Sequence, residues 1–279
     1  MKKIILIVGA VATTAITASA QVLLSGGLTY NQNFDSLPNT PVNGTTTWTD
    51  NSTLLGWYSS RAFTAGTTSA YGPYAYPSVR VGDGTTTSGW LYSFGVAGVN
   101  AVEERAIGST SSGTPKTNIF GVLFQNDTAG NLGDATVSYT GEQWRNGGNT
   151  AAHKLAVSYQ VFSSAVSSPV GVDSAPNNGW TALSALDFTS PTTGATAAAL
   201  DGNAPANRTV LANVPLTGVV LSPGQQIFLR WLDIDDSGND HGLGVDDFSI
   251  TFSAVPEPGT MALAGLAALG FFLRRKFSR

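Results

Sequence analysis

Residues 226–232 read Gln-Ile-Phe-Leu-Arg-Trp-Leu, and residues 245–252 read Val-Asp-Asp-Phe-Ser-Ile-Thr-Phe. Both stretches are rich in β-branched and aromatic residues and mostly alternate apolar with polar side chains. This alternation is typical of half-buried β-strands. Two further segments, 135–140 and 154–162, have the same character. The sequence therefore predicts strands at these four places.

Turns are indicated between the predicted strands by clusters of Asn, Gly, Pro and Ser, at 146–149, 176–179, 222–224 and 237–239. No segment of the chain between its two ends shows sustained helical periodicity. Many short strands at this spacing favour an all-β body, residues 21–254, that forms a single β-sandwich of the jelly-roll type rather than a barrel or propeller.

The alternation along 226–232 also predicts which side chains are buried. Ile227, Leu229 and Trp231 share one face of the strand, and Arg230 lies on the other. We expect Trp231 to be buried beside Phe248 or Ile250 of the next strand, and Arg230 to face outward or the sandwich edge. Phe228 and Leu232 share the face of Arg230, a pattern that would also suit a sheet covered on both sides.

The composition excludes several classes of site. The chain has 279 residues, no Cys, two His and only 11% charged residues. Without Cys there are no disulfides, thiolate zinc sites or Cys nucleophiles. Residues 21–255 hold eight Lys or Arg against seventeen Asp or Glu, a net charge of −9. Since phosphate contacts need clustered cations, we expect no nucleic-acid partner.

The first twenty residues have the features of a secretory signal peptide. Lys2 and Lys3 precede a largely apolar stretch, which ends in the small residues Ala-Ser-Ala at 18–20. This predicts cleavage between Ala20 and Gln21. A retained signal anchor is the alternative, although the apolar stretch is short for a membrane span.

The C-terminal segment 255–279 combines three elements. Val255, Pro256, Glu257 and Pro258 are followed by an apolar run over 260–273 and then by a basic cluster that includes Arg274 and Arg275. The run can form a short membrane helix whose basic end stays cytoplasmic, although a comfortable span needs about 20 residues. An ordinary C-terminal helix packed on the body is the alternative.

This arrangement resembles the PEP-CTERM sorting signal, a segment also labelled the ice-binding protein C-terminal domain. The resemblance rests on the V-P-E-P motif, the short apolar run and the Arg-rich end, over about twenty-five residues. It implies export in a Gram-negative-type bacterium, at least transient membrane contact, processing by an exosortase-type protease, and an association with exopolysaccharide. Nothing in the sequence shows the regular Thr ranks that would bind ice.

The body has a looser resemblance of its own. The stretches 33–37, Asn-Phe-Asp-Ser-Leu, and 244–250, Gly-Val-Asp-Asp-Phe-Ser-Ile, resemble the first and last strands of extracellular lectin-like and carbohydrate-binding jelly rolls. About a dozen residues carry this resemblance. It implies more about the fold than about an activity.

An Asp-rich stretch over 233–247 is the best candidate for a metal site. Carboxylate and amide oxygens are the ligands that calcium prefers, and six residues here supply them: Asp233, Asp235, Asp236, Asn239, Asp240 and Asp246. One interpretation is a structural calcium ion that holds the loop between the last two strands. The other is a solvated acidic hairpin loop that caps its own backbone. We expect His241 to be an exposed turn residue, and His153 has no acidic neighbour in sequence.

An aromatic-rich stretch over 57–92 provides candidates for glycan contact, because flat exposed rings can stack on the apolar faces of sugars. The candidates are Trp57, Tyr71, Tyr74 and Trp90. Core packing is the competing interpretation, since a sandwich buries large aromatic residues.

Catalytic motifs are absent from the sequence. It contains no G-x-S-x-G elbow, H-E-x-x-H helix or phosphate-binding loop. Glu142 is the best remaining acid candidate, with a surface ion pair as the alternative. We therefore expect a non-catalytic protein of the cell envelope or extracellular matrix, with a structural or glycan-binding role. The alternative is a secreted polysaccharide-acting enzyme, for which an open carboxylate-lined groove would be evidence.

Overall fold

A computed structural model of the chain describes residues 21–62, 74–96, 104–166 and 179–256. The predicted signal peptide and the C-terminal segment after Pro256 lie outside these residues, as does Tyr71. No helix among the described residues is long and apolar enough to cross a membrane.

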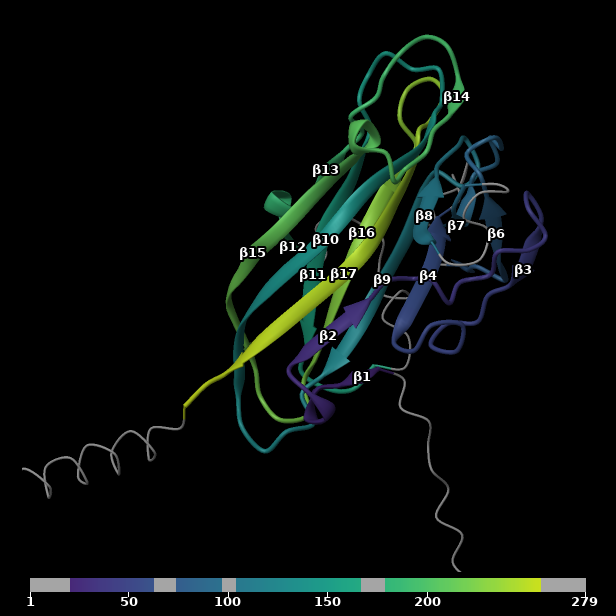
Figure 1. The fold of residues 1–279 in the computed structure, drawn as a ribbon. Helices are drawn as coiled ribbons and strands as arrows, with labels where there is room; N and C mark the ends of the chain where they lie inside the picture. The colour runs from purple at the N-terminus through teal and green to yellow at the C-terminus, as the bar shows by residue number, and fades with distance from the viewer. Residues whose placement is uncertain (1–20, 63–73, 97–103, 167–178, 257–279) are drawn as a thin grey trace, which may run out of the picture.

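The described residues form an all-β structure of two sheets (Figure 1). Eight of the described strands make up the first sheet. Along its main path the order is β12 (Thr181–Ala182), β11 (Lys154–Phe162), β16 (Gln226–Ile234), β9 (Thr117–Gln125), β4 (Trp57–Ala62) and β5 (Tyr74–Ala75). β1 (Val22–Leu23) pairs with β9, and β13 (Phe188–Thr189) pairs with β11.

Nine of the described strands make up the second sheet. Its main path is β14 (Ala198–Ala199), β10 (Leu132–Asn146), β17 (Gly242–Ala254), β8 (Ala106–Thr110), β7 (Trp90–Phe94), β6 (Ser78–Gly82) and β3 (Thr45–Thr47). β15 (Arg208–Leu221) pairs with β10, and β2 (Thr29–Gln32) with β17. The part of the chain that the structure describes also contains three short 3₁₀ helices, Leu24–Gly26, Ser184–Leu186 and Pro205–Asn207.

The longer strands alternate between the two sheets along the chain. β9, β11 and β16 belong to the first sheet, whereas β10, β15 and β17 belong to the second. The predicted strands at 135–140, 154–162, 226–232 and 245–252 are confirmed and fall within β10, β11, β16 and β17. The hairpin expected between the last two strands is wrong, because β16 pairs with β9 and β11 while β17 pairs with β10, β8 and β2.

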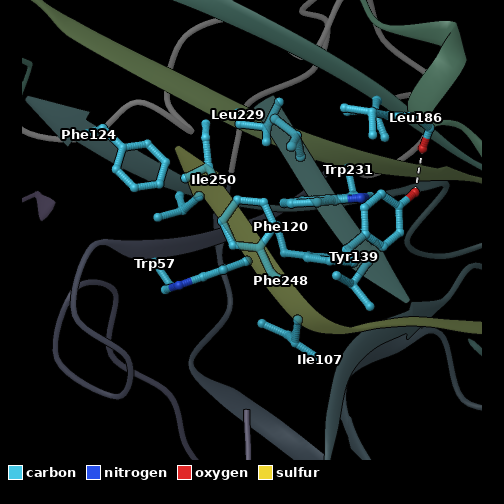
Figure 2. Packing of buried hydrophobic residues seen from close by; sticks show 14 of the residues in the cluster. Trp57, Ile107, Phe120, Phe124, Tyr139, Leu186, Leu229, Trp231, Phe248 and Ile250 are labelled. Atoms are coloured by element: carbon cyan, nitrogen blue, oxygen red, sulfur yellow. Dashed lines mark hydrogen bonds between the residues drawn. The ribbon is translucent and has the colours of Figure 1, made fainter. Parts of the chain in front are cut away.

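The core lies between the sheets, as in a β-sandwich. One cluster of buried apolar residues takes side chains from both sheets. In the first sheet, the ring of Trp231 stacks on the rings of Trp57 and Phe120. The ring centroids are 5.8 Å apart in both pairs. Phe248 of the second sheet packs edge-on against Trp231 at 5.5 Å (Figure 2). The predicted burial of Trp231 is therefore confirmed, although Phe248 faces it across the core and not from a paired strand.

The opposite face of β16 is also buried. Phe228 and Leu232 belong to a second apolar cluster outside the first sheet, together with Trp180. Arg230 is 1% exposed, its guanidinium lies 3.3 Å from the centroid of the Trp180 ring, and its Nε donates to Ser158 Oγ at 2.9 Å. Arg230 therefore lies on the outer face of the sheet, as expected, but it is buried there, because the segment that contains Trp180 covers this face.

Candidate functional site

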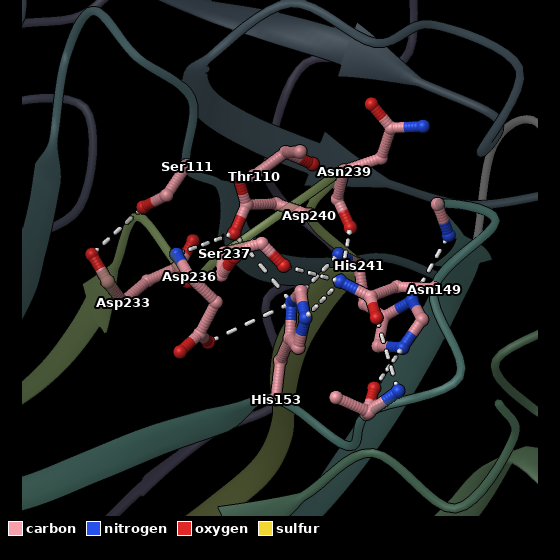
Figure 3. A network of polar contacts seen from close by, with 12 residues as sticks. Thr110, Ser111, Asn149, His153, Asp233, Asp236, Ser237, Asn239, Asp240 and His241 are labelled. Atoms are coloured by element: carbon pink, nitrogen blue, oxygen red, sulfur yellow. Dashed lines mark hydrogen bonds and ion pairs between the residues drawn. The ribbon is translucent and has the colours of Figure 1, made fainter.

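Two loops meet at one end of the molecule, near β14 (Figures 1 and 3). The first, 147–153, joins β10 to β11, and the second, 235–241, joins β16 to β17. The 235–241 loop crosses from one sheet to the other. The 147–153 loop makes the same crossing in the opposite chain direction, so both loops lie over the gap between the sheets.

Two glycines allow the loops to pack backbone against backbone. A Cβ atom on Gly147 would lie 2.1 Å from the carbonyl oxygen of Asp240, so no larger residue fits without a shift of the backbone. Gly238 has a φ of +99°, a conformation that L side chains rarely adopt. Asn149 joins the loops further, because its Nδ2 lies 2.8 Å from the Ser237 carbonyl oxygen and 3.2 Å from that of Asn239.

Both histidines of the chain lie in this contact, with ring centroids 4.3 Å apart. The Nδ1 of His241 accepts the N–H of Gly147 at 2.9 Å, and its Nε2 lies 3.1 Å from the Ala151 carbonyl oxygen. The pKa of His241 is lowered by burial and by His153. His241 is fully buried, so the expectation of an exposed turn residue is wrong.

His153 lies among the carboxylates that follow β16 in sequence. Its Nδ1 is 3.6 Å from Asp236 Oδ2 and 3.5 Å from Asp240 Oδ1. Its Nε2 lies 3.0 Å from Asn149 Nδ2. Asp240 Oδ1 also accepts the backbone N–H of Asp236 at 3.0 Å. Burial lowers the pKa of His153 and raises that of Asp240 to about 7. Because His153 is over 80 positions away in sequence, nothing in the local pattern pointed to this contact.

One of the predicted calcium ligands in this stretch, Asp233, faces away from this cluster. Its side chain points into the interior and accepts a bond from Ser109 Oγ at 2.7 Å, and Ser111 Oγ donates to its backbone oxygen (Figure 3). Burial raises the pKa of the Asp233 carboxyl to about 7. Asp235 lies 4.0 Å from Lys116 Nζ and close enough to Asp240 to contribute to the raised pKa of that carboxyl.

Asp246 is also separate from the loop, on β17. Thr140 pairs with Asp246 and Ser138 with Ser249, so β17 carries one extra residue here, a β-bulge. Asp247, within the bulge, has a φ of 49°. The six oxygen-bearing residues at 233–246 therefore do not all converge on one ion, because Asp233 points into the interior and Asp246 lies with two glutamates on β17.

At the bulge, Asp246 joins two glutamates to form a carboxylate cluster. One oxygen each of Glu104, Glu142 and Asp246 lies within 4.8 Å of the others. Glu142 Oε2 accepts the indole N–H of Trp144 at 3.0 Å. Burial raises the pKa of Glu142 to about 8 and also raises that of Asp246. Glu142 is 1% exposed, so its interpretation as a surface ion pair is wrong.

A polar cavity of about 320 Å³ opens beside the two loops. The cavity is lined by several side chains with hydroxyl, amide or charged groups that could bind a ligand. They are Thr110, Ser111, Ser112, Arg145, Asn239 and Asp240. A hydrogen bond holds the Arg145 guanidinium in place, because its Nη1 donates to the Gly84 carbonyl oxygen at 2.9 Å. The cavity can therefore present fixed hydrogen-bond donors and acceptors to a polar ligand.

Of the aromatic residues predicted for glycan contact, the structure describes the side chains of Trp57 and Trp90, and neither is exposed. Trp57 is fully buried in the core, and its Nε1 donates to Tyr30 Oη at 3.0 Å. That prediction is wrong for Trp57, because the sandwich uses the ring for packing. Trp90 is half-buried, with Arg61 over its ring at 4.7 Å. Of Tyr74, only the backbone in β5 is described.

The last described residues lead into the C-terminal segment that contains the V-P-E-P motif. β17 ends at Ala254, and the N–H of Val255 donates to the Asn131 carbonyl oxygen at 2.9 Å. The remaining motif residues predicted for sorting, from Glu257 to Arg275, lie outside the described residues.

No curated protein matches the chain significantly. A family model, the PEP-CTERM protein-sorting motif, matches residues 254–276. The chain thus carries a PEP-CTERM sorting motif that begins at the end of β17, which indicates an exported protein that is targeted to an exosortase-type system.

Proposed function

We propose that the β-sheet body is a non-catalytic glycan-binding module of the cell envelope or extracellular matrix, and that exopolysaccharide is its ligand. The sorting motif supports an extracytoplasmic site of action. The cavity beside Asp240 is the place where we expect a sugar unit to bind.

The observation that carries this proposal is the chemistry of the cavity. A volume of about 320 Å³ is near the lower end of the range for small-molecule sites. Ser and Thr hydroxyls, the Asn239 amide, the Arg145 guanidinium and the Asp240 carboxylate match the many hydroxyl groups of a sugar, each of which both donates and accepts. A glycan would be held mainly by hydrogen bonds, since none of the described Trp side chains is exposed.

The alternative of a polysaccharide-acting enzyme has less support. A glycosidase places two carboxyl groups across an open cleft. Among the described residues that line this cavity, only Asp240 carries a carboxylate. The cluster of Glu104, Glu142 and Asp246 does bring carboxyl groups together, but Glu142 and Asp246 are 1% and 3% exposed. Neither side chain reaches a substrate without movement of its surroundings.

A glycan array probed with the full chain in mild detergent tests the proposal. The informative variant is Asn239→Ala, because Asn239 is exposed at the cavity and its removal leaves the core intact. Asn131→Ala is the matched control, an exposed Asn in the β9–β10 connection. We expect Asn239→Ala to weaken binding at least about fivefold, as loss of one or more hydrogen bonds worth ~1 kcal/mol or more. Equal binding by all three proteins, or none by the wild type, would contradict it.

A further inference from the structure

The contact between the two loops brings one imidazole and two carboxylates to a common point. His153, Asp236 and Asp240 come from two connections far apart in sequence, and each offers one ligand atom within 4.8 Å of those of the other two (Figure 3). From this convergence we propose that the three residues bind one divalent transition-metal ion of the zinc class. The site shares Asp240 with the cavity proposed for glycan, but its evidence and its test do not depend on glycan binding.

The two distances from Nδ1 fit an ion placed between the imidazole and each carboxylate. Zinc lies at about 2.0–2.2 Å from imidazole nitrogen and carboxylate oxygen. With bonds of about 2.1 Å, the observed separations of 3.5 and 3.6 Å from Nδ1 to the two oxygens correspond to N–metal–O angles of about 110–120°. These angles are close to the tetrahedral value, and three protein ligands leave a fourth position for water.

Both ring nitrogens of His153 have further neighbours. The backbone N–H of His241 lies 3.2 Å from Nδ1, and Asn149 Nδ2 lies 3.0 Å from Nε2. A metal ion at Nδ1 would replace the long bond from His241 and would be bound by the imidazole and the two carboxylates.

The donors are held in place by the surrounding structure. The backbone N–H of His153 donates to Ser190 Oγ at 2.9 Å at the start of β11. The ring is packed against that of His241, and the side chains of His153 and Asp240 are 2% and 4% exposed. The side chain of Asp236 is 47% exposed, which provides a route for an ion from solvent.

The donor set selects the class of metal. Calcium takes six to eight oxygen ligands, whereas zinc accepts one imidazole and two carboxylates in a four-coordinate site. Asp233 and Asp246, which a calcium site in this stretch would need, point elsewhere. An imidazole nitrogen among the donors therefore favours zinc over calcium.

Isothermal titration of the full chain tests the proposal, with a purification tag that lacks histidine and after removal of metal by a chelator. We expect zinc to bind at one ion per chain and calcium to bind at least 100-fold more weakly. Zinc at 100 times its dissociation constant should raise the melting temperature by about 5–10 °C. A wild-type chain that binds no zinc, or binds calcium as tightly as zinc, would overturn the proposal.

Two variants identify the ligands. Asp236→Asn changes the most exposed of the three residues and should weaken zinc binding at least tenfold, whereas Asp201→Asn, an exposed Asp outside the cluster, should stay within twofold. His153→Gln should abolish binding, with folding checked by circular dichroism. If His153→Gln does not fold, Asp236→Asn decides alone. Equal zinc affinity for Asp236→Asn and Asp201→Asn would place the ion elsewhere and overturn the assignment.

Discussion

The rings of Trp231 and Phe248 meet edge to face across the space between the two sheets, with centroids 5.5 Å apart and planes at 85°. The two residues come from strands that are consecutive among the described elements but belong to opposite sheets. The contact therefore joins, through the core, the two strands that flank the crossing loop, 235–241. The same crossing brings the acidic residues of the loop to the histidines.

Truncation of Trp231 should be among the most destabilising single substitutions in the body. The side chain is fully buried and contacts four aromatic rings: Trp57, Phe120, Tyr139 and Phe248. We expect Trp231→Ala to lower the free energy of unfolding by about 3–5 kcal/mol in denaturant titrations. Val210→Ala, at a 65% exposed position, is the control and should change it by less than about 0.5 kcal/mol. Similar small losses at both positions would mean that the core is misassigned.

Arg230 should contribute to stability despite its charge. The guanidinium lies over Trp180 and donates to Ser158, both on the covered face of the first sheet. We expect Arg230→Ala to cost about 2–3 kcal/mol, through lost packing and a desolvated cation–π contact. Lys116→Ala, which removes a half-exposed partner of Asp235, should cost under about 1 kcal/mol. Equal costs, measured by urea denaturation, would indicate that this face is open to water.

The carboxylate cluster should make stability depend on pH. The pKa of Glu142 is raised to about 8, first by burial and then by Glu104 and Asp247, while Trp144 and Arg208 oppose the shift. A raised pKa means that the folded state holds the proton more tightly than the unfolded chain. Stability is then greatest below the unfolded pKa of about 4.3 and falls as the pH rises towards 8.

Glu142→Gln should reduce this dependence, because the amide keeps an oxygen for the indole of Trp144 and carries no charge. We expect the variant to melt several degrees above the wild type at pH 9 and close to it at pH 5. Asp134→Asn, at an exposed position, controls for the change in net charge. A wild-type melting temperature that rises between pH 5 and pH 9 would contradict the predicted sign.

Processing at both ends follows from the terminal segments. The mature protein should begin at Gln21 and lose its tail near Pro256 to Pro258 in a host that has an exosortase-type protease. Intact-mass analysis of envelope and secreted fractions measures both cuts at once. Recovery of a chain with both ends retained would show that neither signal is processed there.

Much of the fold could be predicted from local pattern. The alternation in 226–232 and 245–252 identified β16 and β17 and the inward face of Trp231. Sheet membership could not be read in the same way, because pairing joins segments over a hundred residues apart, such as β16 with β9. The outer face was ambiguous for the same reason: the side chains of Phe228 and Arg230 are covered by a distant segment.

The site was predicted only in part. The Asp-rich stretch pointed to the correct loop, and Asp236 and Asp240 do lie together there. His153 was missed, since its carboxylate neighbours are brought to it by the crossing between sheets. Trp57 was assigned to a glycan platform because an aromatic-rich sequence does not reveal which rings the core uses.

Glycan binding at the cavity beside Asp240 can be measured by a nuclear magnetic resonance titration of the isotope-labelled full chain with fragments of the host exopolysaccharide. We expect saturable shifts of the backbone amides at 110–113 and 237–240, which line the cavity or adjoin it, and weaker shifts for Asn239→Ala. Shifts confined to another face of the sheets, or no shifts at millimolar glycan, would contradict it.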